Sequence, residues 1–398
     1  MSAVEGQRLS RTVVLLLAVT CGLAVANLYY VQPLLNEVGA DFGVGETATG
    51  LLVTASQIGY VLGLALLVPV GDLVERRRLI ATLLLAAALA AAGCAAAPAF
   101  PVLAAALVVL GLLSTVAQIV VPLSSSLAGP EERGQVVGTV MSGLLIGILS
   151  ARTLSGLVAE LGGWRLVFGV AAVAMVALAL LLARALPLAP PPEPTTYPRV
   201  LRSVLTLIRT EPVLRQRMAL GAFGFACFSI LWTAIAFLLG SHYGYGEGVI
   251  GLFGLAGIAG ALVAPLSGRL ADRGHGRAAV TLFLALLLAS WGLLDLGGTS
   301  IVALVAGIVV LDLGVQGAHI NHQATIYALR PEARSRVTTA YMVSMFCGGV
   351  AGSVLAATVY GAAGWGPTCL LGAGMAGGAL VVWGLTQRMA AAPLRSPA

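Results

Sequence analysis

Charged residues are scarce in this sequence. Only 10% of its 398 residues are charged, none of them is lysine, and 59% are hydrophobic. A soluble globular chain carries about 25% charged residues. Too few polar side chains are available here to cover the outside of a water-soluble fold, so we expect lipid to surround most of the chain.

Several chemical signatures are also missing from the sequence. The five cysteines are scattered without the spacing of a disulfide framework or a metal site. No G-x-x-x-x-G-K-[ST] motif occurs, so we expect no loop that binds nucleotide phosphates. His319 and His322 stand three residues apart, but no acidic residue or cysteine beside them in sequence supplies a third metal ligand. We therefore expect neither a bound metal nor a cofactor.

Long apolar runs make up most of what remains. In lipid, backbone polar groups must pair within the protein, so only helices or a closed barrel can span. The runs are continuous rather than alternating, which excludes a barrel. A helix needs roughly 20 apolar residues to cross the bilayer. On this basis we predict twelve spans, at residues 12–35, 47–71, 79–97, 102–127, 135–159, 164–186, 217–240, 248–270, 278–296, 300–329, 335–360 and 365–387.

Arginine supplies every basic residue, and its placement is one-sided. With these boundaries, all arginines except Arg152 and Arg165 fall at one side of the membrane. Loops rich in basic residues face the cytoplasm, so we predict that both termini and the central linker are cytoplasmic. The first loop on the other side is acidic (Glu37, Asp41, Glu46). The net charge of +6 thus reflects membrane topology, and binding to nucleic acid is not expected.

The second half of the chain repeats the first. With a shift of 201 residues, eight residues recur in register: Pro130, Glu131, Arg133, Val136, Met141, Gly147, Gly163 and Trp164. Two six-helix units in the same orientation form a parallel repeat. Between them, a proline-rich stretch precedes a short amphipathic segment that suits the membrane surface. We predict an N-terminal bundle (1–186), a cytoplasmic linker (187–216) and a C-terminal bundle (217–398).

The loops after the second and eighth spans carry a motif. Residues 268–277 read G-R-L-A-D-R-G-H-G-R, and residues 71–78 read G-D-L-V-E-R-R-R. Together with the span count and the repeat, these loops resemble the signature G-x-L-x-D-R-x-G-R-R of the major facilitator superfamily. The resemblance implies a monomeric transporter of small molecules, and the composition suggests a bacterial cytoplasmic membrane. It also implies a cytoplasmic gate latched by Asp72, Arg76, Arg77, Asp272 and Arg273.

The tenth span carries a polar stripe. Its four members, spaced by four, three and four residues on one helical face, are Asp312, Gln316, His319 and Gln323. Such a stripe is costly against lipid and must face protein or water. Members of this family line a central cavity with helices 1, 4, 7 and 10, so the resemblance implies that the stripe is cavity wall. We expect six residues in the substrate cavity: Asn27, Tyr30, Gln118, Trp232, Gln316 and Gln323.

Two charges, Asp312 and Arg152, lie deep in predicted spans. An isolated charge there costs about 2.5–3.5 kcal/mol on insertion scales, so each should have a function. We predict that Asp312 carries a proton, that His319 shares it, and that Arg152 pairs with Asp312 in one conformation. Exporters of the resembled superfamily have proline where Arg152 stands. The alternatives are a structural ion pair for Asp312 and a hydrogen-bonded cavity residue for His319.

The leading functional hypothesis is proton-coupled export of small amphipathic drugs or metabolites. Residues 27–35 read N-L-Y-Y-V-Q-P-L-L, which resembles the first helix of drug- and metabolite-exporting members. Uptake or facilitated diffusion of a polar solute such as a sugar is the alternative among transporters. A membrane enzyme or a non-transporting receptor is an alternative of another class. No cluster of nucleophile, base or metal ligands stands out in the sequence, so we do not expect an enzyme.

Overall fold

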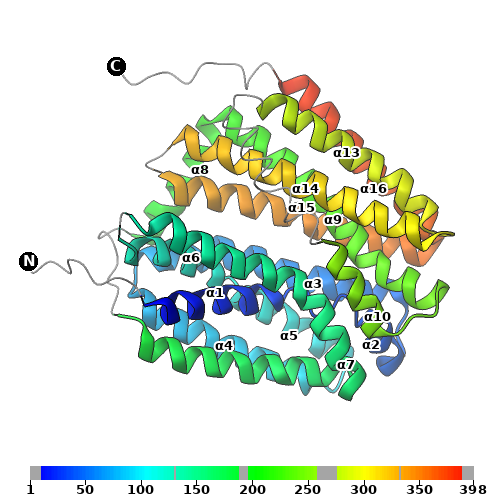
Figure 1. Ribbon diagram of the computed structural model, residues 1–398, viewed down its shortest axis with the longest axis horizontal. Helices are drawn as coiled ribbons and strands as arrows, with labels where there is room; N and C mark the ends of the chain where they lie inside the picture. Colours follow the sequence, from blue (N-terminus) through cyan, green and yellow to red (C-terminus); the bar gives the residue numbers. More distant parts are fainter. Residues whose placement is uncertain (1–9, 130, 188–195, 258–275, 331–332, 388–398) are drawn as a thin grey trace, which may run out of the picture.

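The computed structural model describes residues 10–129, 131–187, 196–257, 276–330 and 333–387. Within these ranges every regular element is helical, which confirms the expected all-α class. The helices form two bundles that lie side by side (Figure 1).

The helix bounds show how the chain is divided. The first bundle contains α1 (Arg11–Ala26), α2 (Leu35–Phe42), α3 (Glu46–Leu66), the 3-10 helix η1 (Val68–Asp72), α4 (Arg76–Ala95), α5 (Phe100–Leu113), α6 (Val116–Leu127) and α7 (Arg133–Ala185). The connecting helix is α8 (Tyr197–Thr210). The second bundle contains α9 (Pro212–Phe237), the π-helix η2 (Leu238–His242), α10 (Glu247–Leu252), η3 (Phe253–Gly257), α13 (Gly276–Leu296), α14 (Ile301–Leu329), α15 (Arg334–Ala363) and α16 (Trp365–Thr386).

Length and composition identify the helices that can cross a membrane. In the described part of the chain there are nine candidate spans, and α5 and α6 together form one of them, Phe100–Leu127. Another is the 53-residue α7, which covers the expected span 135–159 and nearly all of the expected span 164–186. Helix α1 and the segment Glu247–Gly257 are apolar but shorter. The rest of the expected span 248–270 lies outside the described residues.

Glycines turn the chain between paired spans in each half. Within α7 the backbone leaves the helical region at Gly162 and Gly163, and Gly163 has φ 76° and ψ 172°. Gly364, between α15 and α16, has φ 77° and ψ −160°. Positive φ is accessible to glycine at little steric cost. Because Gly163 and Gly364 are 201 positions apart, the sequence repeat reappears here as a shared backbone conformation.

The first span is not the single long helix that the sequence predicts. We expected one helix over 12–35, but α1 ends at Ala26 and the residues up to Leu34 form turns. The α-helical bonding gives way before Pro33, where the N–H groups of Leu28 and Tyr29 bond to carbonyls three residues back. Pro33 then keeps the helix from resuming at once, because proline has no N–H to donate and disfavours helical backbone at the preceding residue. The unwound segment therefore presents its side chains without helical spacing, in the region where the bundles meet.

The most extensive contacts between the bundles are made by two helix pairs: α3 packs against α15, and α7 packs against α10. A Cβ atom on Gly50 would lie 2.6 Å from the Cβ of Ala357, so only glycine permits this approach of α3 to α15. A Cβ on Gly251 would lie 2.5 Å from the carbonyl oxygen of Arg152. Small residues thus let the two halves touch backbone to backbone, as at close helix crossings in membranes.

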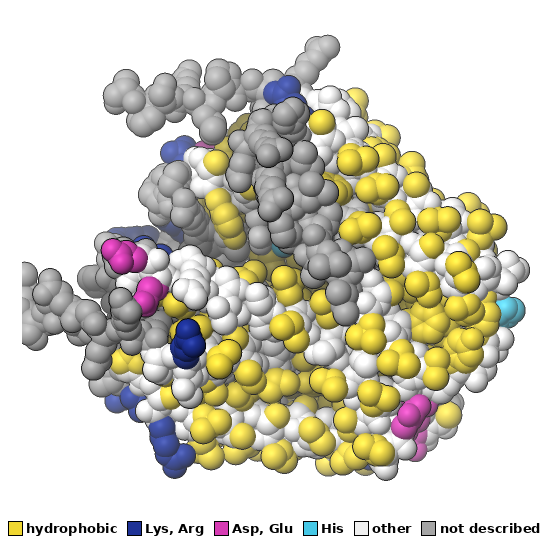
Figure 2. Space-filling model, viewed as in Figure 1, with side chains coloured by type: hydrophobic (Ala, Val, Ile, Leu, Met, Phe, Trp, Pro, Cys, Tyr) yellow, Lys and Arg dark blue, Asp and Glu magenta, His cyan; other side chains and the backbone are white. Residues whose placement is uncertain are grey.

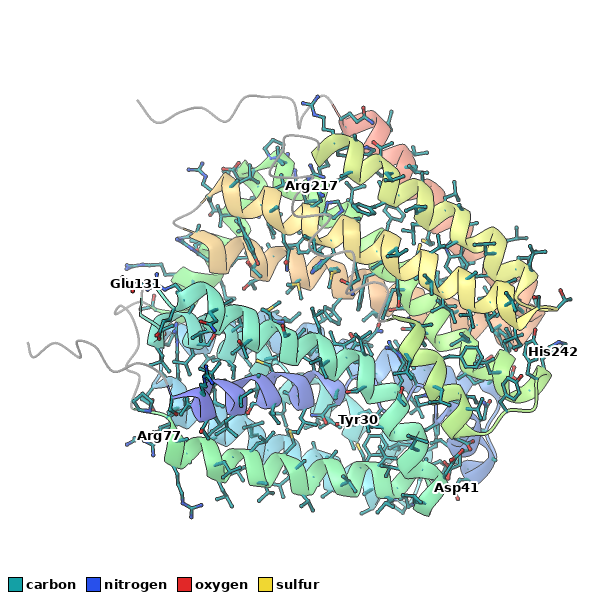
Figure 3. The ribbon with its side chains drawn as sticks, in the orientation of Figure 1. Tyr30, Asp41, Arg77, Glu131, Arg217 and His242 are labelled. Atoms are coloured by element: carbon teal, nitrogen blue, oxygen red, sulfur yellow. The ribbon has the colours of Figure 1, made fainter. Side chains whose placement is uncertain are left out.

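The surface separates apolar and charged side chains. Hydrophobic side chains cover much of the face in Figure 2, and most arginines visible there gather at one end. Figure 3 places Arg77 at this arginine-rich end and Asp41 at the opposite, acidic end. Helix α8 has no buried residue, and Tyr197 Oη donates to the carbonyl of Leu66 at 3.0 Å. The distribution fits a lipid-covered belt between two polar ends.

Candidate functional site

A cavity of about 620 Å³ lies between the bundles. It is lined by α1, α3, α6 and α7 from the first half and by α9, α13, α14 and α15 from the second. It extends from Tyr29 and Phe228 to Ser125, Val137 and Thr338. The last three residues lie near helix ends at the arginine-rich end of the molecule, so the cavity reaches toward that end.

Contacts between the halves close the opposite end. Asn36 Nδ2 donates to the carbonyl of Ala236 at 2.7 Å, and Ser241 Oγ donates to Glu46 Oε1 at 3.0 Å. The hydroxyls of Thr54 and Ser353 are 2.8 Å apart. The cavity is therefore separated from the acidic end by hydrogen bonds that join α2, α3, α9 and α15.

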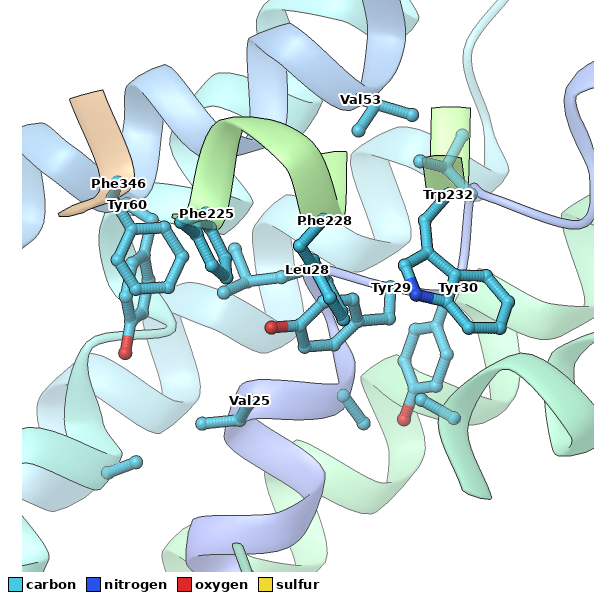
Figure 4. Close-up of a cluster of buried hydrophobic side chains, with 14 of the residues drawn as sticks. Val25, Leu28, Tyr29, Tyr30, Val53, Tyr60, Phe225, Phe228, Trp232 and Phe346 are labelled. Carbon is cyan, nitrogen blue, oxygen red and sulfur yellow. The ribbon is translucent and has the colours of Figure 1, made fainter. Parts of the chain in front are cut away.

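A row of aromatic rings runs along the cavity wall (Figure 4). Tyr60 and Phe225 each lie 4.5 Å from Phe346, centroid to centroid, and Phe225 stacks on Phe228 at 5.3 Å. Trp232 follows, 6.1 Å from Phe228. The row connects the open part of the cavity with the buried charges at its closed end.

Arg152 is a buried cation held by aromatic faces. It is only 3% exposed, and its Nε donates to Gln32 Oε1 at 2.6 Å. Its guanidinium carbon lies 4.0, 4.7 and 5.4 Å from the ring centroids of Trp232, Tyr29 and Phe228. Cation–π contacts of this kind are strongest where water is excluded. Its Nη2 has no hydrogen-bond partner in the described structure.

Asp312, on α14, is the acidic neighbour of Arg152. It is 3% exposed, and its Oδ1 has no hydrogen-bond partner among the described residues. The opposite charges attract each other, but the described structure has no salt-bridge contact between them. Trp232 is close enough to interact electrostatically with the carboxylate, although its Nε1 meets no partner in hydrogen-bond geometry. An incompletely paired buried charge is costly, so the charge of Asp312 and the position of Arg152 depend on one another.

The polar stripe of α14 borders the cavity over three of its four residues. Gln316, His319 and Gln323 line it, whereas Asp312 is buried beyond them. His319 Nδ1 and Tyr341 Oη are 2.9 Å apart and share a hydrogen bond. His319 follows Asp312 by seven residues, about 10 Å along a helix that rises 1.5 Å per residue. A proton can therefore pass between the two only through intervening groups or water.

The other expected cavity residues fall into two groups. Gln118 lines the cavity and donates to Tyr60 Oη at 3.3 Å. Asn27 instead points into the first bundle, where its Nδ2 donates to Ser114 Oγ at 3.2 Å. Tyr30 is buried away from the cavity lining, and Trp232 packs on Arg152. Asn27 is the C-cap of α1 with helical backbone angles, and its side chain lies on the face of α1 that packs in the first bundle, whereas Tyr30 lies in the turns that follow.

Sequence reasoning missed a second buried cation. Arg217, at the start of α9, belongs to the arginines that the one-sided pattern assigns to the cytoplasmic surface, yet it is only 4% exposed. Its Nη1 lies 3.3 Å from His322 Nδ1, and its guanidinium lies 5.0 Å from the ring centroid of Trp383. Its neighbour Arg215 binds the exposed carbonyls of Ile208 and Arg209. No sequence signal distinguishes the two arginines.

Two of the expected gate residues bind backbone carbonyls at the arginine-rich end. Arg76 Nε donates to the carbonyl of Gly71 at 2.9 Å, and Arg77 donates to that of Ala183 near the end of α7. Cations beside the last carbonyls of a helix stabilise it. Arg77 thereby ties the start of α4 to the end of α7.

The carboxylate that caps α4 is Glu75, which accepts hydrogen bonds from the backbone N–H groups of Arg77 and Arg78. Asp72 lies in η1, four residues before α4. The matching gate residues of the second half, Asp272 and Arg273, lie outside the described residues.

Comparisons with known proteins agree with this architecture. The sequence matches the family model described as Major Facilitator Superfamily over residues 15–329. The uncharacterized transporter YgaY of Escherichia coli O157:H7 is 48% identical over 376 residues, which cover 94% of this chain and 95% of that protein. The chloramphenicol resistance protein of Streptomyces lividans is 28% identical over 357 residues, covering 87% and 88%.

Solved structures share the fold. A bacterial homolog of the human lysosomal transporter Spinster, in an inward-facing and occupied conformation, superposes with a TM-score of 0.77 at 14% identity, covering 96% of this chain and 98% of that one. At this identity the likeness shows the fold alone. Together with the family match over most of the chain, it leads to one conclusion: this chain belongs to the Major Facilitator Superfamily and is a membrane transporter of small molecules, not an enzyme.

Proposed function

We propose that this transporter exports small amphipathic organic molecules, such as drugs or metabolites, in exchange for protons by alternating access. The observation that carries the proposal is the buried Asp312 beside Arg152 at the closed end of the cavity. Export against a gradient needs an energy source, and ionisable residues inside a membrane protein commonly mark proton relays. Asp312 is suited to bind a proton on one side of the membrane and release it on the other.

The cavity supports a substrate that is largely apolar. Its volume of about 620 Å³ falls within the roughly 300–1,000 Å³ typical of small-molecule sites. The aromatic row and the aliphatic side chains of α7 offer an apolar wall, and Gln118, Gln316 and Gln323 supply isolated polar contacts. A polar solute such as a sugar would leave much of this wall poorly matched. The name of the S. lividans relative, a chloramphenicol resistance protein, also favours export.

The topology completes the proposal. We assign twelve spans to the chain, as a monomer in a bacterial cytoplasmic membrane, with both termini and the linker in the cytoplasm. The cavity then faces the cytoplasm in the conformation described, ready to receive an export substrate. The proposed cytoplasmic gate comprises Asp72, Arg76, Arg77, Asp272 and Arg273.

Protonation offers a way to couple the gradient to the conformational change. A proton on Asp312 removes the negative charge that attracts Arg152. The guanidinium then remains bound by Gln32 and the three aromatic rings, which belong to α9 and to the segment after α1. The loss of a negative charge on α14 thereby changes the electrostatic attraction that acts on helices of both halves. His319, bonded to Tyr341, is placed to relay protons between Asp312 and the open part of the cavity through water.

The test is substrate-dependent proton movement in vesicles that contain the purified protein. A panel of toxic amphipathic compounds is first screened on cells with and without the transporter, and active compounds are then added to vesicles that enclose a pH-sensitive dye. We expect the wild type to exchange protons for the compound. Asp312→Asn should abolish proton movement yet retain exchange of labelled for unlabelled compound. The exposed Asp295 provides a matched control, Asp295→Asn, which should behave as wild type. Proton movement that survives in Asp312→Asn would contradict the proposal.

A further inference from the structure

The pair formed by Arg217 and His322 has a defined hydrogen-bond polarity. Arg217 Nη1 and His322 Nδ1 are 3.3 Å apart. A guanidinium donates hydrogen bonds and cannot accept them, and it stays charged in proteins. Nδ1 must therefore be the acceptor, which fixes His322 in the neutral tautomer that carries its hydrogen on Nε2.

This hydrogen on Nε2 has no acceptor. His322 is 1% exposed, and its Nε2 lacks a hydrogen-bond partner within the described part of the chain. Arg217 is 4% exposed, and its Nε also has no hydrogen-bond partner there. Buried donors without acceptors are costly. His322 is also one of the residues that line the cavity, although Nε2 itself is buried, so an acceptor that enters from the cavity reaches Nε2 once the neighbouring side chains move slightly.

The charges around the cavity favour an acceptor that is negative. The buried charged side chains among the described residues are Arg152, Arg217 and Asp312, two cations and one anion. The two ion pairs found in the described ranges, Arg165–Asp41 and Arg330–Glu211, both lie elsewhere. The π-face of Trp383 is the contact that partly compensates Arg217. A buried cation is stabilised by a counter-charge, and protonation of Asp312 would make the region still more positive.

We propose that His322, backed by Arg217, binds an anionic oxygen group of the transported molecule, such as a carboxylate. This inference rests on the proposed export function and narrows its substrate class to amphipathic organic acids. The Nε2–H of His322 donates to the acid, and Arg217, as a positioning residue, fixes the tautomer and supplies the positive potential. The apolar body of the ligand lies against the aromatic row, where Tyr60, Phe225 and Phe346 line the cavity.

The test compares two ligands of nearly the same shape, one anionic and one neutral. 2-Naphthoate and its neutral amide, 2-naphthamide, are titrated into the purified transporter in detergent, with binding measured by calorimetry. We expect the wild type to bind the acid at least about tenfold more tightly than the amide. Arg217→Met and His322→Phe should each reduce this preference to below about threefold. The exposed Arg202 on α8 provides a matched control, Arg202→Met, which should retain the full preference.

The comparison on the wild type needs no variant, so it can overturn the inference even if Arg217→Met fails to fold, and His322→Phe then tests the assignment to this site. An acid that binds no more tightly than the amide overturns the inference, whatever the proton-exchange assay shows for Asp312. A full preference for the acid in both folded variants, verified by unchanged melting temperatures, also overturns it. Because the binding measurement uses no proton gradient, failure of proton-coupled export leaves its outcome unaffected.

Discussion

Arg152 shows how a single charged residue can be accommodated inside a membrane protein. Among the residues described, its surroundings include an amide oxygen, the backbone carbonyl of Ile148 and three aromatic faces rather than a carboxylate in salt-bridge contact. Burying a cation this way avoids a tight ion pair that would neutralise Asp312 permanently. The proposed role of Asp312 needs a carboxylate that can change its charge while the guanidinium keeps most of its stabilising contacts.

Gln32 is the residue that most directly holds Arg152. Gln32→Leu removes the acceptor of the 2.6 Å hydrogen bond and leaves Nε of the guanidinium unpaired. A hydrogen bond to a charged group contributes about 1.5–3 kcal/mol, so the free energy of unfolding should fall by about that amount. Denaturation in detergent measures the change, and transport should weaken in parallel. The exposed Gln135 supplies the control Gln135→Leu. Equal stability of the two variants would show that this bond does not hold Arg152.

Asp41, at the acidic end, gives a prediction for pH. The Arg165 guanidinium, together with a hydrogen bond from Trp164 Nε1 at 3.1 Å, holds the pKa of Asp41 below its ordinary value of 3.8. A lowered pKa in the folded protein means that this carboxylate stabilises the fold above its unfolded pKa, and that the effect is lost as pH falls through the folded pKa. Asp41→Asn should therefore lower the melting temperature at neutral pH.

Melting temperatures measured at several pH values check the direction of this pH dependence. The difference in melting temperature between wild type and Asp41→Asn should shrink toward zero as pH falls from about 4 to about 2, below the ordinary pKa range of aspartate. Burial raises the pKa of the nearby Glu37, which gives the opposite pH trend, but Glu37 is common to both proteins and largely cancels in the difference. A difference that stays constant across this range would contradict the assignment.

At the scale of elements, the points where helices break shape the candidate site as much as the helices themselves do. The first helix ends at Ala26, and the turns that follow it carry Tyr29 and Gln32 to Arg152. Unwound backbone within the membrane is tolerated where it lies inside the protein or borders a cavity, and discontinuous helices commonly form transporter sites. The break in the first span thus belongs to the candidate site.

The two glycine turns allow a paired test of the repeat. Gly163 and Gly364 have φ of 76° and 77°, with ψ near 180°. This region is almost exclusive to glycine, and other residues there cost about 1–3 kcal/mol. We expect Gly163→Ala and Gly364→Ala to reduce the free energy of unfolding by similar amounts in this range. Gly169→Ala, at a helical position where an added Cβ meets nothing within 4 Å, should be neutral or slightly stabilising. Unfolding in detergent distinguishes them, and a neutral effect at either turn would contradict the shared conformation.

At the scale of the molecule, the two bundles enclose a cavity that is closed at one end by direct contacts. Alternating access requires these contacts to break and others to form at the opposite end. Helices α3 and α15 form one of the closing pairs, with Thr54 and Ser353 hydrogen-bonded across it.

A disulfide across this pair should arrest the cycle. Thr54→Cys combined with Ser353→Cys, in a background with the exposed Cys347 replaced by serine, places two thiols where hydroxyl oxygens are 2.8 Å apart. We expect oxidation to stop transport and a reducing agent to restore it, because opening of the acidic end separates α3 from α15. The two single-cysteine variants are the controls. Full transport by the cross-linked protein would show that this pair does not separate during the cycle.

Much of the architecture followed from the amino-acid sequence. Hydropathy predicted helices, and the match of Gly163 and Trp164 with Gly364 and Trp365 predicted a repeat that the turn geometry reproduces. The spacing of Gln316, His319 and Gln323 predicted one polar face, and all three line the cavity. Helical periodicity correctly predicts which side chains share a face wherever the helix is continuous. Asn27 and Tyr30 were expected in the cavity because they belong to the first span rather than from periodicity, and neither is among the residues that line it.

The sequence by itself determined that this chain is helical, embedded in lipid and built twice, because composition and periodicity act through local backbone and solvation energies. Only the tertiary structure decided which charges meet. Arg152 lies against Gln32 and Trp232, and Arg217 against His322, across separations of about 80 to 120 residues that no local pattern encodes. The electrostatics of the site depend on these distances, and distances between helices are set by packing rather than by spacing along the chain.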